Sequence, residues 1–334
     1  MQVIQEQAAR ITSLEIQGAT NIAFFAIKIF NEFVQRHKDA PKPELWKMIR
    51  EAENILVHSR ATEPGMRNGL LYIIGKILQD KKQKLNPLNL GELVQKYSEE
   101  YIEILKDAKH KIARIGAKRI PHDAKDGFTV MTHCHSSIVE AILIEAHKQG
   151  RKFRVICTET RPKFQGRITA KTLLEAGLDV SLVVDSAMRW VCKNEHVYII
   201  FIGADAITSE GTVLNKIGSR LLALVAEEED IPFYVASPLF KFNLGTLTGD
   251  LERIERRDID EVWSHKEALH LGTRPTELKI LNPAFETVNR KYIDGIITET
   301  GLYPADHTHF MFEKAYPFLV EGAKVGEDEY SGWD

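Results

Sequence analysis

Cysteines are few in this chain, and long apolar runs are missing. Three cysteines occur among 334 residues, Cys134, Cys157 and Cys192, and no two of them form a CxxC pair. An odd number without such spacing excludes a disulfide scaffold and indicates a reducing compartment. No stretch approaches the roughly 20 apolar residues of a membrane span, and the first residues lack the basic and apolar regions of a signal peptide. We therefore expect a cytoplasmic protein without a membrane partner.

Neither sign of charge dominates the sequence. The 44 basic and 47 acidic residues leave a formal net charge of −3. No overall field therefore attracts nucleic acid, and we expect no nucleic-acid partner. Any binding of phosphate must come from local basic groups.

The spacing of apolar residues divides the chain into two parts. Over residues 1–120 they recur at helical spacing, as at Ile22, Ala26 and Ile29, which predicts an all-helical domain of about five helices. Over residues 121–334 short β-branched runs alternate with helical patterns, which predicts a Rossmann-like domain with a parallel sheet. The expected fold class is α/β, a helical N-terminal domain followed by this sheet domain. Strands are expected at residues 127–130, 153–157, 180–184, 197–202, 232–236 and 295–298.

Cys134 lies where a predicted strand passes into a predicted helix, in the run Met131-Thr132-His133-Cys134-His135-Ser136. Backbone amides and the macrodipole at a helix N-terminus favour a thiolate, so we expect a lowered pKa and a reactive thiol. A buried structural thiol is the alternative. His133 and His135 suggest a metal site as a further alternative. Strand alternation directs them away from Cys134, however, and the sequence offers no second pair of ligands.

Asp205 follows another predicted strand, at the carboxyl end of the apolar run 197–202. The carboxyl ends of parallel strands share one edge, where open α/β sheets bind ligands, so Cys134 and Asp205 are expected to face one pocket. Desolvation by the apolar strand raises a carboxyl pKa, as an acid catalyst working near neutrality requires. An ordinary turn or N-cap aspartate is the alternative.

Two segments carry cations suited to phosphate. Residues 211–218 are predicted to be a turn entering a helix, with Lys216 in its first turn, where lysine opposes the macrodipole and a bound anion complements it. Residues 159–166 form a loop after a strand and carry Arg161, although a solvated surface loop explains this segment equally well.

Together these runs resemble the archaeal ribose-1,5-bisphosphate isomerases. This family is related to methylthioribose-1-phosphate isomerase and to the α, β and δ subunits of eukaryotic translation initiation factor 2B. Order and spacing agree over nearly the whole chain. The matching runs are Thr132-His133-Cys134-His135-Ser136, residues 159–166, Val184-Asp185-Ser186-Ala187, Gly203-Ala204-Asp205-Ala206-Ile207, Asn215-Lys216-Ile217-Gly218 and Asn282-Pro283-Ala284-Phe285.

The resemblance implies a catalytic pair and a substrate site. The family's catalytic cysteine corresponds to Cys134 and its catalytic aspartate to Asp205, a pair that the initiation-factor α subunit is not expected to retain. Substrate-binding residues, most of them implied by the resemblance, are expected to be Gln17, Gly18, Ala19, Thr20, Arg60, Ser136, Arg161, Asn215, Lys216 and Lys241.

One position departs from the family pattern. The isomerases typically have Arg-Gly-Ala where this chain has Gln17-Gly18-Ala19, which removes a bidentate phosphate ligand. Residues 59–64 resemble the family's Thr-Arg-Pro-Thr only loosely, although Arg60 is kept. Arg67 is a candidate to replace the missing arginine, and the change leaves room for a related sugar phosphate.

The resemblance implies an aldose-ketose isomerase that converts ribose 1,5-bisphosphate to ribulose 1,5-bisphosphate. Asp205 would assist ring opening, and Cys134 would accept a proton from C2 or orient groups for a hydride shift. No metal or organic cofactor is needed. The alternatives are a methylthioribose-1-phosphate isomerase and a non-catalytic regulatory subunit that binds a nucleotide or sugar phosphate. Family analogy further implies a homo-oligomer, a dimer or a hexamer, and allows a nucleotide activator.

Overall fold

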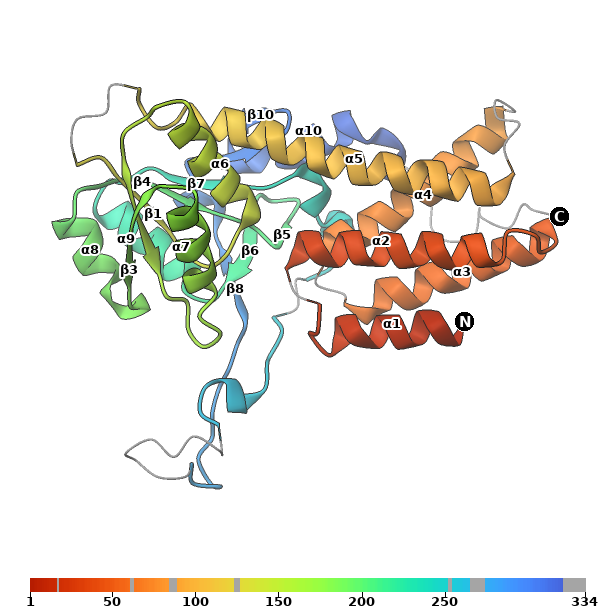
Figure 1. The fold of residues 1–334 in the computed structure, drawn as a ribbon, viewed down its shortest axis with the longest axis horizontal. Helices are drawn as coiled ribbons and strands as arrows, with labels where there is room; N and C mark the ends of the chain where they lie inside the picture. Colours follow the sequence, from red (N-terminus) through yellow and green to blue (C-terminus); the bar gives the residue numbers. More distant parts are fainter. Residues whose placement is uncertain are drawn as a thin grey trace. The chain divides into compact units, whose positions relative to one another are not determined.

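The chain divides into two compact units in the computed structural model (Figure 1). The first unit contains Met1–Ala108, Leu239–Leu251 and the residues from His309 onward, and the second contains Lys109–Pro238 and Glu252–Thr308. The helical part therefore includes segments from late in the chain, which apolar spacing does not reveal. The boundary predicted near residue 120 stays a prediction. The structure describes residues 1–16, 18–60, 63–83, 89–122, 127–251, 254–264 and 274–320.

Five helices occupy the described part of the first 117 residues, as the apolar spacing predicted. Each buries an apolar stripe; in α2, for example, Ile22, Ala26 and Phe30 are fully buried. The start of α3 is fixed by proline, because Pro43 lies in its first turn, where an amide has no helical partner. The bounds are α1 (Gln2–Thr12), α2 (Ala19–Arg36), α3 (Lys42–Ser59), α4 (Pro64–Gln83) and α5 (Leu90–Ala117).

The late segments complete the core of the first unit. Phe240, Phe242 and Phe312 are fully buried in it, and the Phe240 ring meets Tyr101 edge-on with 4.8 Å between centroids. The side-chain amide of Asn68 donates to the carbonyls of Phe240 and Phe242, both at 2.8 Å, and so fixes this segment to α4. The elements concerned are the 3-10 helices η2 (Leu239–Lys241) and η3 (Leu244–Thr248) and the helix α10 (Thr308–Ala315).

The second unit is built on a seven-stranded sheet of order β10-β9-β7-β4-β1-β2-β3. Neighbouring strands are parallel except β10, which runs antiparallel to β9. The six parallel strands lie within two residues of the predicted positions, so the predicted fold class is confirmed. The bounds are β1 (Thr129–Thr132), β2 (Arg154–Thr158), β3 (Asp179–Val183), β4 (Val197–Ile202), β7 (Phe233–Ala236), β9 (Gly295–Thr298) and β10 (Gly301–Tyr303).

Helices cover both faces of this sheet. Successive residues of β1 point to opposite sides: Val130 packs in one apolar cluster with α6 and α7, and Met131 packs in another with α8 and α9. A parallel sheet covered on both faces leaves its strand ends as the accessible edges. The helix bounds are α6 (Ser137–Lys148), α7 (Gln165–Glu175), α8 (Met188–Asn194) and α9 (Ser219–Glu228).

A small antiparallel sheet, which the sequence patterns did not predict, forms part of the second unit. It has the order β5-β6-β8, with β5 (Ala206–Ile207), β6 (Val213–Lys216) and β8 (Phe285–Val288). The predicted position of Lys216 in the first turn of a helix is therefore wrong. Lys216 ends a strand, and α9 begins only after Gly218, whose φ of 103° permits the turn between them.

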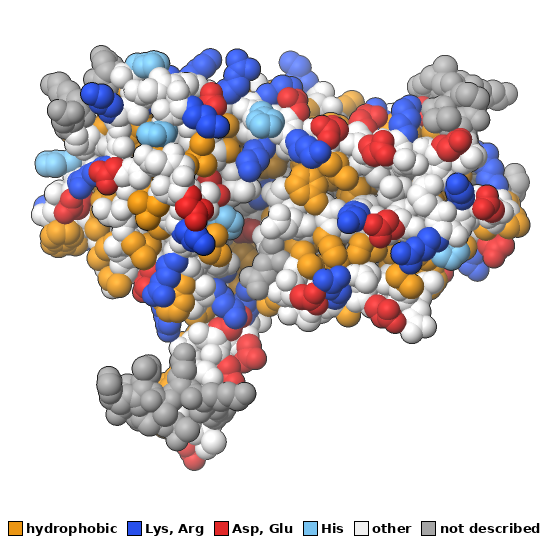
Figure 2. Space-filling model, in the orientation of Figure 1, with side chains coloured by type: hydrophobic (Ala, Val, Ile, Leu, Met, Phe, Trp, Pro, Cys, Tyr) orange, Lys and Arg blue, Asp and Glu red, His pale blue; other side chains and the backbone are white. Residues whose placement is uncertain are grey.

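The surface carries charges of both signs. On the face shown in Figure 2, Lys and Arg side chains alternate with Asp and Glu side chains, and apolar side chains lie between them. No helix among the described residues is long and apolar enough to cross a membrane.

The close packing of α7 against β2 can be tested at Gly166. A Cβ placed there would lie 1.7 Å from the Thr158 carbonyl oxygen, so Gly166→Ala must displace backbone. We expect it to lower the free energy of unfolding by about 2 kcal/mol or more, measured by urea denaturation. Gly65→Ala is the control, because a Cβ there meets no atom within 4 Å and a helical alanine stabilises. Equal effects of the two changes would contradict the packing described.

Candidate functional site

Cys134 and Asp205 lie on loops that leave neighbouring parallel strands at the same edge. β1 pairs directly with β4, and the two loops begin at the carboxyl ends of these strands. A Cβ on Gly203 would lie 2.7 Å from the hydroxyl oxygen of Ser136, so the loops pack against each other. The topology therefore brings together the two segments that carry the thiol and the carboxylate.

Burial raises the pKa of the Cys134 thiol to about 11. The positive charge of Lys216 and the backbone N–H of His135 oppose this rise, whereas the negative charges of Asp205 and Asp185 add to it. The lowered pKa expected from a helix N-terminus is therefore wrong. α6 begins three residues beyond Cys134, and desolvation of the thiolate outweighs the charges that favour it.

Lys216 is a buried cation beside Cys134 and Asp205. It lies opposite Phe285 in the β6–β8 pair, and its Nζ is 4.8 Å from the centroid of that ring. Burial lowers the pKa of Lys216, while the charges of Cys134 and Asp205 both act to raise it. Cys134 and Lys216 thus act on each other, and the charge of Asp205 acts on both. We call these three side chains the Cys–Asp–Lys cluster.

Arg257 is a second buried cation next to this cluster, and sequence patterns did not identify it. Its Nε donates to a Glu255 carboxylate oxygen at 3.0 Å, and its guanidinium carbon lies 5.8 Å from the centroid of Phe285, the ring that Lys216 also contacts. Its Nη1 is buried and has no hydrogen-bond partner among the described residues. Within the charged run Ile254-Glu255-Arg256-Arg257, nothing in the sequence distinguishes it from a surface arginine.

The N-terminus of α9 is already occupied by a protein carboxylate. Glu286 accepts hydrogen bonds from the backbone amides of Gly218 at 2.6 Å and Arg220 at 3.0 Å. Asn215, which precedes Lys216 on β6, is buried and donates to the Ser219 hydroxyl at 2.9 Å. The anion site expected at this helix terminus is therefore filled by Glu286. Lys216 lies at the end of β6 instead of in the first turn of α9.

The two histidines beside Cys134 are both engaged with the protein. His133 is buried, with Nε2 donating to the Ile217 carbonyl at 2.8 Å and Nδ1 lying 2.6 Å from the Thr158 hydroxyl. Burial lowers the pKa of His133, which favours the neutral ring. The His135 Nδ1 lies 3.0 Å from a Glu140 carboxylate oxygen. Among the residues that the structure describes, no group of three or more His, Cys, Asp and Glu side chains could hold a metal.

Arg161 and Ser136 also have partners within the second unit. The exposed Arg161 guanidinium donates to the Val262 carbonyl at 3.1 Å and lies 5.0 Å from the Phe164 ring centroid. Ser136 is the N-cap of α6, and its hydroxyl accepts from the Val139 amide at 3.4 Å. Each side chain therefore has a structural role beside the expected binding role.

The other predicted binding residues belong to the first unit. Gly18, with φ 85°, precedes Ala19 and Thr20 at the start of α2, and Gln17 lies outside the described residues. The remaining three are the cations Arg60, Arg67 and Lys241. The Arg60 Nε lies 3.5 Å from a Glu63 carboxylate oxygen, and the Arg67 Nη1 donates to the Asn243 side-chain oxygen at 3.4 Å. Lys241 is the last residue of η2.

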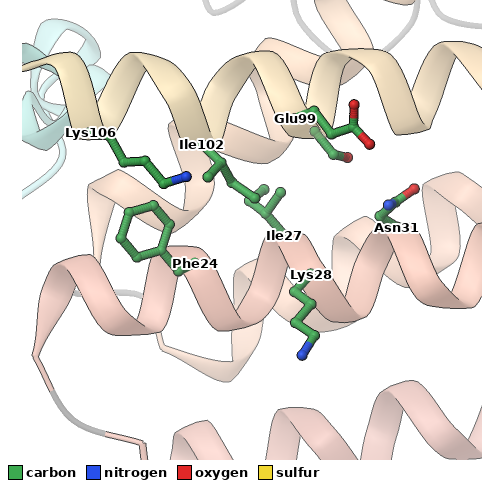
Figure 3. Close-up of a pocket in the computed structure, with 8 residues that line it drawn as sticks. Phe24, Ile27, Lys28, Asn31, Glu99, Ile102 and Lys106 are labelled. Atoms are coloured by element: carbon green, nitrogen blue, oxygen red, sulfur yellow. The ribbon is translucent and has the colours of Figure 1, made fainter.

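A groove of about 260 Å³ lies elsewhere in the first unit, between α2 and α5 (Figure 3). Its walls are mainly apolar, with lysines on both helices. None of the predicted site residues lines it. The lining residues are Phe24, Ile27, Lys28, Asn31, Ser98, Glu99, Ile102 and Lys106.

Comparison of the sequence with known proteins gives consistent matches along most of its length. Residues 15–305 match the Initiation factor 2 subunit family. Ribose 1,5-bisphosphate isomerase of Methanocaldococcus jannaschii is 37% identical over 319 residues, covering 96% of this chain and 97% of that protein. The protein of that name in Archaeoglobus fulgidus is 39% identical over 314 residues, covering 93% of each. Methylthioribose-1-phosphate isomerase of Thermosipho africanus is 31% identical over 330 residues, covering 90% and 86%.

Solved structures give the same picture of the fold. The translation initiation factor eIF-2B of Pyrococcus horikoshii matches with a TM-score of 0.73 and 27% identity, covering 90% of this chain and 96% of that one. The 5-methylthioribose 1-phosphate isomerase of the same organism matches with a TM-score of 0.72 and 25% identity, covering 93% and 88%. Enzymes and initiation factors thus share this architecture, so residues rather than fold must distinguish them.

The raised pKa of Cys134 predicts how its alkylation by iodoacetamide depends on pH. The rate should keep rising to about pH 11, because burial holds the thiol protonated, whereas an ordinary cysteine is fully ionised well below that. Lys216→Met should slow alkylation at pH 9 by removing a charge that favours the thiolate. Lys193→Met, on α8, is the control and should leave the profile unchanged. A rate that levels off below pH 8 would contradict this account.

Proposed function

We propose that this chain, which belongs to the initiation factor 2 subunit family, is an aldose-ketose isomerase that converts ribose 1,5-bisphosphate to ribulose 1,5-bisphosphate. Relatives bearing the name ribose 1,5-bisphosphate isomerase match it over nearly their whole length. The observation that carries the proposal is the Cys–Asp–Lys cluster at the carboxyl edge of the sheet. An acid, a potential base and a phosphate-binding cation are the groups that this reaction needs.

The first step opens the sugar ring. A phosphate on C1 locks the ring, so the bond between C1 and the ring oxygen breaks only with acid assistance. Asp205 delivers a proton to the ring oxygen as that bond breaks. Its buried neighbours Ala204 and Ala206 limit access of water to the carboxyl group.

The second step moves hydrogen between C2 and C1. The Cys134 thiolate accepts the proton from C2, which leaves a C1–C2 double bond. Protonation of C1 and loss of the C2 hydroxyl proton then give the ketone. In a hydride-shift route Cys134 would only orient these groups. A deuterium placed on C2 of the substrate would then move to C1 without exchanging with solvent.

The charge of Asp205 acts on the Cys134 thiol. Burial is the main cause of the raised Cys134 pKa, and the negative charge of Asp205 adds to it. A neutral Asp205 carboxyl group would not oppose the thiolate in this way.

Lys216 binds one of the two phosphates in this proposal. Its buried ammonium and the guanidinium of Arg257 both lie against Phe285, and the charge of Arg257 disfavours the charged form of Lys216. A dianion between or beside them would stabilise both cations, and it would give the Arg257 Nη1 an acceptor. Asn215 precedes Lys216 on β6, and its expected role in substrate binding rests on the family resemblance.

Further assignments in the proposal rest on the family resemblance alone. These assignments include substrate binding by Ser136, by Arg161, by Gln17 and by the other predicted residues of the first unit. They also include replacement of the missing arginine by Arg67. A homo-oligomer, a dimer or hexamer, a nucleotide activator and a cytoplasmic location also belong here.

The nearest alternative is a methylthioribose-1-phosphate isomerase, which needs an apolar site in place of a second phosphate site. The relative of that name is 31% identical, against 37% and 39% for the two bisphosphate isomerases. A non-catalytic binding subunit is the other alternative, and Gln17 favours it. Retention of both Cys134 and Asp205 favours an enzyme.

Replacing either catalytic group should slow isomerisation strongly. We expect Cys134→Ser and Asp205→Asn each to lower turnover of ribose 1,5-bisphosphate by about 10²- to 10⁴-fold, because each removes a proton-transfer group. The product ketone is followed by carbon-13 NMR. Cys192→Ser, a buried cysteine on α8, is the control and should keep full turnover, and thermal melting checks that all variants are folded. Undiminished turnover in Cys134→Ser or Asp205→Asn removes that residue from the mechanism.

The substrate itself is tested by offering both sugar phosphates to the wild-type protein. Ribose 1,5-bisphosphate should give the ketone signal, and methylthioribose 1-phosphate should give it more slowly, because it cannot use a second cationic phosphate site. A faster reaction with methylthioribose 1-phosphate would identify the protein as a methylthioribose-1-phosphate isomerase. No ketone from either compound would support the binding subunit.

A further inference from the structure

Cys134 has a backbone conformation that its side chain disfavours. Its φ is 69°, in the left-handed region that residues other than glycine rarely adopt. The residue follows β1 by two positions, so this conformation ends the alternation of the strand just before the thiol. Such a conformation persists only where neighbouring groups fix it.

Two threonines hold the peptide groups on either side of Cys134. The Cys134 amide donates to the Thr160 hydroxyl oxygen at 3.0 Å, and the Thr169 hydroxyl donates to the Cys134 carbonyl at 3.3 Å. Both threonines are buried, so these hydrogen bonds compete little with water.

Thr160 is itself fixed by Asp185. One carboxylate oxygen accepts from the Thr160 amide at 2.8 Å, and the other accepts from the Arg161 amide at 2.6 Å. Thr160 also has a left-handed φ, of 61°. A carboxylate that accepts two adjacent amides stabilises a loop conformation that would otherwise relax.

The hydrogen bonds around Thr160 have a defined direction. Because the Ile217 carbonyl can only accept, His133 carries a proton on Nε2, and in the neutral ring that burial favours its Nδ1 accepts from the Thr158 hydroxyl at 2.6 Å. Thr158 can then accept from the Thr160 hydroxyl, 3.3 Å away, while the lone pairs of the Thr160 oxygen accept from the Cys134 amide. The Ile217 carbonyl thus sets the direction of the bonds that link His133, Thr158 and Thr160, and the Cys134 amide donates at the end of this chain.

We propose that the chain of hydrogen bonds from the Ile217 carbonyl through His133, Thr158 and Thr160, with Asp185 holding Thr160, positions Cys134 for proton transfer. We call this chain the positioning network. The effect of the network on catalysis rests on the proposed function. Its effect on the backbone conformation of Cys134 rests on geometry alone. The side chains of the network are positioning residues, because they act through Cys134.

The catalytic consequence is tested with matched variants of Thr160. Thr160→Val keeps the shape and removes the hydroxyl, so Cys134 loses its acceptor; we expect kcat to fall about 10- to 100-fold with KM changed less than threefold. Thr160→Ser keeps the hydroxyl and should restore kcat to within about threefold of wild type. Equal losses in both variants, or a loss confined to KM, would overturn the proposal.

The structural consequence is tested without any enzyme assay. Glycine tolerates a φ of 69°, so Cys134→Gly should have an unfolding equilibrium constant about fivefold or more smaller than Cys134→Ala, measured in urea. At positions with an ordinary negative φ, the alanine variant is usually more stable than the glycine variant. In a Thr160→Val background the advantage of glycine should shrink, because residue 134 is then free to relax.

These two experiments separate the inference from the proposed function. If the wild-type protein has no isomerase activity but Cys134→Gly is more stable than Cys134→Ala, and this advantage shrinks in the Thr160→Val background, the positioning network stands and the function falls. If Cys134→Ala is the more stable variant, the positioning network is wrong whatever the activity.

Discussion

The parallel pairing of β1 with β4 is the constraint on which the rest of the site depends. It places the loops carrying Cys134 and Asp205 at one edge of the sheet, although the two residues are 71 positions apart in sequence. The small antiparallel sheet contributes Lys216, the last residue of β6, to the same cluster. A single edge thus collects thiol, carboxylate and ammonium, and none of them needs a loop of unusual length to reach it.

Burial gives this cluster its chemical character. Desolvation raises the pKa of Cys134 and lowers the pKa of Lys216, so both groups are shifted toward their neutral forms in the free protein. A doubly charged ligand would change this balance, because its phosphate favours the charged lysine and the lysine in turn favours the thiolate. Under the proposed function, substrate binding and activation of the thiol would be coupled in this way, and Cys134 would stay protonated until the substrate binds.

Much of the fold followed from the sequence, because its signals are local. Five helices and six parallel strands are visible as apolar spacing, and the family resemblance from six short runs is confirmed by the match over residues 15–305. Contacts between distant segments carry no such signal. The strand containing Lys216 is four residues long and pairs with Phe285, which is distant in sequence. The raised pKa of Cys134, the role of Glu286 at α9 and the buried Arg257 likewise depend on tertiary packing.

The central claim is that Cys134 and Asp205 act on the same sugar. A crystal structure of the Cys134→Ala variant with bound ribose 1,5-bisphosphate tests it most directly. The account predicts that C2 of the sugar lies beside the methyl group introduced by that substitution, with the Asp205 carboxyl group within hydrogen-bond distance of the ring oxygen and one phosphate on Lys216. A sugar phosphate bound away from this edge, or an Asp205 carboxyl group directed away from the ring, would contradict it.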